Sequence, residues 1–138
     1  MRDLKFRIWD NDTGQFVSGE HPRFIGNVNG IYLFDKNYRI LCGVDGQKPK
    51  DWTFQQFTGL LDKNSKEIYE GDIIRWEDQI VTKATVEFDT ARFILNIFSH
   101  PEYSKTAGKY FTDFYRVPLS KLEVIGNIFE NSELLNEI

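Results

Sequence analysis

Cysteine is nearly absent from this sequence, with Cys42 as the one example among 138 residues. A lone thiol cannot form an intrachain disulfide, so nothing points to an oxidising compartment and an intracellular location is the default. Cys42 lies among apolar residues, where a buried and inert thiol is expected. We therefore expect neither a disulfide framework nor cysteine catalysis.

Histidine is almost as scarce. His21 and His100 are each followed by proline, and neither has a second His or Cys at metal-ligand spacing. The sequence also contains no nucleophile elbow, no phosphate-binding glycine loop and no zinc-protease helix motif. These absences predict a protein without a metal site, a cofactor or a catalytic constellation.

Long apolar runs are missing as well. No segment approaches the roughly 20 consecutive apolar residues that cross a bilayer, and the first nine residues lack the apolar stretch of a signal peptide. We expect a cytoplasmic protein without membrane contacts. Because one hydrophobic core serves a chain of this length and no repeat or linker divides it, we predict a single domain over residues 1–138.

Positive charge is absent from the C-terminal end, where four glutamates and no Lys or Arg follow Lys121. The whole chain has 17 basic and 21 acidic residues, so the two signs balance before that point. A surface that follows a phosphate backbone needs concentrated Lys or Arg. We therefore do not expect nucleic-acid binding.

Aromatic residues, in contrast, are abundant: they make up 15% of the chain, and 12 residues are Phe. Such side chains pack well on the pleated surface of a sheet, so most of them favour a β-rich core. Any that remain outside the core would form a recognition surface.

Period-2 alternation predicts strands along the chain. Residues 4–9 alternate, and Asp10–Gly14 is a turn that leads back to Gln15–Val17. An EF-hand calcium loop is not expected there, because Gly14 falls where such a loop needs an oxygen ligand. Residues 18–30 read as a surface connection. Further strands are expected at residues 31–34, 38–44, 52–57, 80–88, 92–98, 109–117 and 122–129.

A short helix is predicted at the C-terminus. Asn131 suits an N-cap, Glu133 suits the first helical turn, and Leu134, Leu135 and Ile138 share one helical face. We expect that face to dock on the domain or to join two copies of the chain.

Residues 57–76 form the stretch around which the other strands are expected to be organised. Asp62–Lys66 reads as a turn between two apolar arms, and Gly71 interrupts the next strand, which marks a bulge, a bend or a close backbone approach. Four carboxylates lie close in sequence and would do acid–base chemistry only if folding paired them. They are Glu70, Asp72, Glu77 and Asp78.

Three blocks of sequence together resemble the YopX-like proteins of bacteriophages and prophages. They are residues 5–10 (Lys-Phe-Arg-Ile-Trp-Asp), residues 56–74 and residues 124–131 (Val-Ile-Gly-Asn-Ile-Phe-Glu-Asn). The resemblance implies a phage or prophage origin in a bacterial cytoplasm and a compact fold of bent, coiled antiparallel sheets that is barrel-like. It implies no catalytic residues. Ser65 replaces the glycine usual in the family's turn, so we predict positive φ there.

Three functions follow as hypotheses. The first is a non-enzymatic accessory protein that binds a host or phage protein. The second is a nucleic-acid-binding module that stacks bases on an aromatic strand. The third is an enzyme that uses Glu70, Asp72 or His100. The candidate binding surface consists of Trp76, Lys109, Tyr110, Tyr115 and Arg116.

Overall fold

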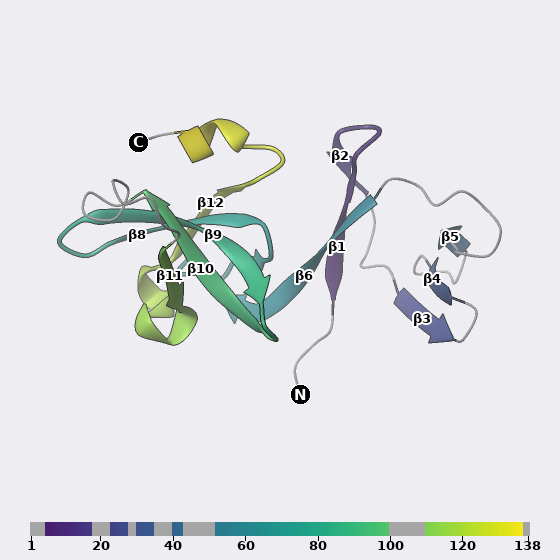
Figure 1. Cartoon of the computed structure of the whole chain (residues 1–138), viewed down its shortest axis with the longest axis horizontal. Coiled ribbons are helices and arrows are strands. Elements are labelled where there is room, and N and C mark those ends of the chain that lie inside the picture. Colours follow the sequence, from purple (N-terminus) through teal and green to yellow (C-terminus); the bar gives the residue numbers. More distant parts are fainter. Residues whose placement is uncertain are drawn as a thin grey trace. The chain divides into compact units, whose positions relative to one another are not determined.

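The computed structural model of this chain describes residues 5–17, 23–27, 30–34, 40–42, 52–99 and 110–136. Antiparallel strands dominate these residues, as predicted, and the remaining regular elements are short 3-10 turns (Figure 1). The strands are β1 (Phe6–Asp10), β2 (Gln15–Phe16), β3 (Arg23–Asn27), β4 (Gly30–Phe34), β5 (Ile40–Cys42), β6 (Trp52–Leu61), β7 (Glu67–Tyr69), β8 (Asp72–Glu77), β9 (Val81–Asp89), β10 (Arg92–Ser99), β11 (Tyr110–Asp113) and β12 (Glu123–Asn127); the 3-10 turns are η1 (Phe114–Arg116), η2 (Leu119–Lys121) and η3 (Ser132–Asn136).

The chain divides into two compact units, an N-terminal unit that ends at Gln56 and a C-terminal unit that begins at Phe57. The first half of β6 pairs with β1, and its second half pairs with β7. Each unit is described by itself below. The single domain over residues 1–138 stays a prediction.

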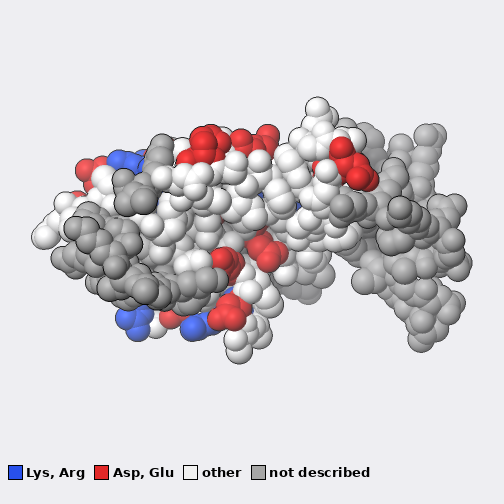
Figure 2. Space-filling model, turned by 45° about the horizontal axis from the view of Figure 1, so that its top comes forward, with Lys and Arg blue, Asp and Glu red and all other residues white. Residues whose placement is uncertain are grey.

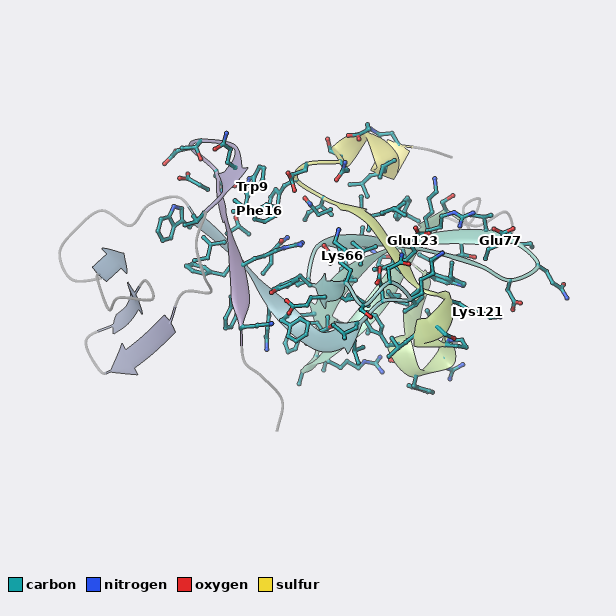
Figure 3. The ribbon with its side chains drawn as sticks, turned by 180° about the vertical axis from the view of Figure 1, so that it is seen from behind. Trp9, Phe16, Lys66, Glu77, Lys121 and Glu123 are labelled. Carbon is teal, nitrogen blue, oxygen red and sulfur yellow. The ribbon has the colours of Figure 1, made fainter. Side chains whose placement is uncertain are left out.

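In the N-terminal unit, the Asp10–Gly14 turn is confirmed. The Asp10 carboxylate accepts the N–H groups of Asp12 and Thr13, and Gly14 adopts a φ of 67°. Strand β1 is buried on both faces at Ile8 and Trp9, because the Trp9 ring packs edge-on against Phe16 with centroids 4.9 Å apart (Figure 3). Alternation alone had indicated a half-buried strand.

A second, three-stranded sheet of the N-terminal unit has the order β3-β4-β5. Strand β5 falls within the predicted range 38–44. Strand β4 covers the predicted range 31–34 and begins one residue earlier, at Gly30. Strand β3 corrects the predicted surface connection over residues 18–30. Its residues pair with β4 from Arg23↔Phe34 to Asn27↔Gly30, so ladder hydrogen bonds form despite the glycine and asparagine that suggested a loop.

The C-terminal unit is built on a five-stranded sheet with the order β11-β10-β9-β8-β12, which curls into a half-barrel (Figure 1). Buried residues alternate along β9, at Thr82, Ala84 and Val86, so one face of this strand turns inward. Adjacent residues are buried in β8 (Ile73 and Ile74) and in β10 (Ile94 and Leu95), so these two strands are covered on both faces. The core cluster consists of Ile68, Ile74, Trp76, Ala84, Val86, Leu95 and Leu122.

Gly71 lies between β7 and β8, and its backbone connects residues 57–76 to two other parts of the unit. It adopts a φ of 84°, which a side chain would strain. Its N–H donates to the carbonyl of Val86 at 2.8 Å, and its carbonyl accepts the N–H of Ile128 at 2.9 Å. The predicted close backbone approach at this glycine is confirmed.

The Asp62–Lys66 turn is also confirmed, and its aspartate reaches beyond the turn. Asp62 is 7% exposed. One carboxylate oxygen accepts the N–H groups of Asn64 and Lys66, and the other accepts the N–H of Val124 in β12 at 2.9 Å. The N–H of Lys63 donates to the carbonyl of Leu122. The turn therefore lies along the free side of β12.

The predicted C-terminal helix is wrong. No α-helix occurs among residues 110–136, and Ser132–Asn136 forms a 3-10 turn without a fully buried side chain. The Asn131 side chain accepts the N–H of Asn127 instead of acting only as a helix cap. A segment this short also lacks the length that sustains an α-helix. Ile138 lies outside the described residues, and self-association through this segment stays a prediction.

The predicted strand over residues 109–117 is shorter than expected. The ladder ends at Asp113, and Phe114–Arg116 forms η1, closed by the N–H of Val117 donating to the carbonyl of Phe114. Phe114 and Val117 pack against the core cluster. Folding onto the core thus outweighs continued strand pairing at this point.

The substitution Ser65→Gly is expected to stabilise the protein. Ser65 has a φ of 63°, and the left-handed region costs a residue with a Cβ about 1 kcal/mol. Part of this gain is offset by the flexibility of glycine in the unfolded chain, so the melting temperature should rise by about 2–4 °C. Asn64→Gly, in the same turn but not at positive φ, is the control and should lower the melting temperature.

Asp62→Asn should destabilise the protein by about 2–3 kcal/mol at pH 7, because an amide oxygen cannot accept hydrogen bonds from all three N–H donors.

The effect of this substitution should depend on pH. Burial raises the pKa of Asp62. The N–H donors of Val124, Lys66 and Asn64 and the charge of Lys66 together lower the pKa by more than burial raises it, so the net pKa lies below its ordinary value of 3.8. The stabilisation is thus complete above about pH 4 and disappears as pH falls through the lowered pKa. Urea unfolding across pH 2–7 should show the difference between wild type and variant shrinking only in acid. Asp78→Asn, at an exposed carboxylate, is the control.

Candidate functional site

Of the five residues of the predicted binding surface, the structure describes the side chains of three, Trp76, Tyr115 and Arg116. Trp76 is 9% exposed and belongs to the core cluster, so its ring packs inside the unit. Tyr110 is the first residue of β11, and its side chain lies outside the described part of the chain. Lys109 lies outside the described residues altogether. Tyr115 and Arg116 are the pair that the structure does bring together.

Tyr115 is the most exposed of the large hydrophobic side chains in the described residues, with 79% of its surface accessible. The guanidinium carbon of Arg116 lies 5.6 Å from the centre of its ring, within cation–π range. The Arg116 Nε also donates to the Tyr115 hydroxyl at 3.3 Å. This arrangement presents a flat aromatic surface with a positive charge beside it.

The turn η1 holds this pair in place from behind. Phe114 points inward against the core while its neighbour Tyr115 points outward. Just before the turn, the Asp113 carboxylate forms an ion pair with Arg92 of β10 at 2.7 Å. Tyr115 and Arg116 therefore project from a turn anchored on both the core and the sheet, and we call them the η1 surface.

The four clustered carboxylates lie at the two ends of β8. Asp72 is 1% exposed and accepts the N–H of Tyr69 at 2.8 Å, which closes the turn around Gly71. Glu70 lies in the same turn beside Gly71. Glu77 lies at the other end of β8, where it pairs with Arg75. Asp78 follows Glu77 and pairs with η2 through Lys121, which is labelled in Figure 3. The contacts of Asp72, Glu77 and Asp78 thus support a turn and a strand end.

No group of three His, Cys, Asp or Glu residues that could hold a metal ion occurs in the described part of the chain. Within the same residues, no helix has the length and apolar character needed to span a membrane. His21 and His100 lie outside the described residues, so a site built on either is a prediction only.

Charged side chains of both signs appear on the described part of the face shown in Figure 2. Acidic side chains stand there in several clusters, with basic side chains between some of them. The expected absence of nucleic-acid binding stays a prediction.

One exposed aromatic group was missed at the level of sequence. Phe88 in β9 is 49% exposed and lies directly opposite Phe93 in β10, with ring centroids 5.1 Å apart. The sequence contained a pattern that could have identified it, since Phe88 continues the alternating apolar row of Ala84 and Val86 up to the hairpin turn. Sequence could not show that the row extends past the part of the sheet that is covered.

A curled antiparallel sheet and short 3-10 turns make the described part of the chain mainly β. Protein EF1440 from Enterococcus faecalis has a similar fold: its crystal structure matches with a TM-score of 0.59 and 21% sequence identity, covering 98% of this chain and 99% of that one. Residues 5–136 match the family described as YopX protein, and the chain belongs to this family. No curated protein matches the chain.

Truncations at η1 should distinguish its outward side chain from its inward one. Tyr115→Ala should change the free energy of unfolding by less than about 0.5 kcal/mol, because the ring is exposed. Phe114→Ala should cost about 2 kcal/mol, because it removes contacts with the core. Chemical denaturation measures both. Equal losses for the two variants would mean that Tyr115 is a structural residue.

Proposed function

We propose that this YopX-family protein acts by binding another protein and not by catalysis. The observation that carries the proposal is the η1 surface, in which an exposed tyrosine lies on an anchored turn with an arginine beside it. Tyrosine and arginine are enriched among the residues that contribute most to protein–protein affinity. Because the turn itself is held by the core and the sheet, little backbone freedom is lost on binding.

The wider setting is part of the same proposal. Resemblance to phage and prophage proteins supports a phage or prophage origin, the bacterial cytoplasm as the location and a host or phage protein as the partner.

Nucleic-acid binding is the second candidate, since an exposed tyrosine with an arginine beside it is also a platform for an unpaired base. The burial of Trp76 removes one of the three aromatic residues of the predicted binding surface. The net charge of −4 opposes the other contacts such a module needs. Protein binding therefore remains the preferred function.

A tagged pull-down from a bacterial host lysate tests the proposal. A partner recovered by the wild-type chain should be depleted at least tenfold with a Tyr115→Ala, Arg116→Ala double variant, since loss of two such anchors removes more than about 1.4 kcal/mol. Arg75→Ala, a partly exposed arginine in β8, is the matched control and should recover the partner normally.

Fluorescence anisotropy with single- and double-stranded DNA and RNA at about 150 mM salt provides the opposing measurement. Binding of naked nucleic acid should be weak. Sub-micromolar, salt-sensitive binding that disappears in the double variant would replace the protein-binding proposal with the nucleic-acid one.

A further inference from the structure

The two edges of the five-stranded sheet differ in what covers them. Strand β12 lies at one edge, and the Asp62–Lys66 turn bonds to the backbone on its outer side. Strand β11 lies at the other edge, and within the described part of the chain no strand lies beyond it. An edge strand without such cover offers its backbone to a strand of another molecule.

The β9–β10 hairpin determines which backbone groups of β11 point away from the sheet. Both residues of its loop have positive φ, as in a type I′ turn, which closes on a hydrogen-bonded pair, here Asp89↔Arg92. From Arg92 onward, every second residue of β10 bonds to β9, and the residues between them bond to β11. Leu95 is one of the latter, so it exchanges hydrogen bonds with its register partner Thr112.

Phe111 and Asp113, on either side of Thr112, therefore direct their N–H groups outward. Among the described residues, these N–H groups donate to no other segment. Natural sheets protect such an edge with proline, a bulge or a charge. Residues 110–113 contain no proline, their pairing with β10 has no bulge, and the Asp113 carboxylate is already paired with Arg92 at 2.7 Å. The sequence of β11 thus does not oppose the addition of a strand.

The spacing of the two outward residues matches a second copy of the same strand. When two β11 strands run antiparallel about a twofold axis at Thr112, Phe111 of each copy lies opposite Asp113 of the other. Both residues point outward, so these two pairs form four backbone hydrogen bonds. Of the neighbouring registers, one sets the two Asp113 carboxylates opposite each other, which is unfavourable. The other keeps only two of the four hydrogen bonds within β11.

We propose that this protein forms a symmetric dimer in which the β11 strands of two copies pair antiparallel, with Thr112 of each copy at the twofold axis. The two sheets then become one continuous sheet, and the two threonines form a favourable cross-strand pair. The inference goes beyond the proposed protein-binding function and does not depend on it. It uses β11 and not the C-terminal segment from which the sequence predicted self-association. A dimer would carry two η1 surfaces and would bind a divalent partner with higher avidity.

Cysteine cross-linking tests the position of the axis. Thr112→Cys, combined with Cys42→Ser so that each chain has one thiol, should form a disulfide-linked dimer when oxidised glutathione is added. Directly opposed residues of a non-hydrogen-bonded pair have Cα atoms about 4.5 Å apart, within the range of a disulfide. Thr85→Cys in the same background is the matched control. Thr85 is also partly buried but lies in β9, inside the sheet, so this variant should run as a monomer on a non-reducing gel.

A proline at position 111 tests the backbone contact. Phe111→Pro removes an outward N–H group and no hydrogen bond to β10, so the chain should stay folded. The dimer loses two of its four donors, and its dissociation constant should rise at least tenfold. Phe111→Ala loses the same ring but keeps the N–H group, so it is the matched control and should dimerise nearly as wild type. Sedimentation equilibrium measures the association, and thermal melts show that each variant is folded.

Three results would overturn the inference. The first is a wild-type chain that is monomeric at every concentration. The second is a dimer that Thr112→Cys does not lock, which would place the contact elsewhere, and this result decides the matter even when Phe111→Pro fails to fold. The third is a disulfide from Thr112→Cys to a different protein, which would make β11 a strand for another partner. The Tyr115→Ala, Arg116→Ala pull-down tests the proposed function separately from all three.

Discussion

The buried carboxylate of Asp62 is the interaction on which the C-terminal unit depends most. Its two oxygens order the turn between β6 and β7 and at the same time bind the backbone of β12, which lies about 60 residues further along the chain. Burying a charge is costly unless it is fully hydrogen-bonded, and here three backbone donors offset that cost. A local turn is thereby coupled to a distant strand, so neither can loosen without exposing the charge or leaving its donors unpaired.

Backbone contacts at two glycines complete the same attachment. Gly71 exchanges hydrogen bonds with Val86 on one side and Ile128 on the other. A Cβ at Gly126 would lie 2.5 Å from the side-chain oxygen of Asn131, which itself accepts the N–H of Asn127. Residues 56–74 and 124–131, two of the blocks that resemble the family, are therefore largely the two sides of one packing arrangement.

The features that sequence predicted well are local ones. Turns at Asp10–Gly14 and Asp62–Lys66 were found because their residues bond to their own backbone or interrupt an alternating pattern. The prediction of a C-terminal helix was wrong because the side chain of Asn131 accepts a hydrogen bond from the N–H of Asn127. That contact depends on the position of β12, which ends at Asn127. Sequence placed Trp76 and Tyr115 in the same aromatic surface, whereas one ring is in the core and the other is in solvent. That difference follows from how η1 folds onto the core, which no local pattern specifies.

Strand β12 lies at the edge of its sheet, a position that ordinarily leaves a row of backbone groups open to a strand from another molecule. Here the carbonyl of Leu122 accepts the N–H of Lys63, and the N–H of Val124 is bound by the Asp62 carboxylate. A turn of the protein's own chain thus occupies the site where an intermolecular strand would begin to add. The contact that fixes β12 also protects a chain rich in phenylalanine from edge-to-edge aggregation.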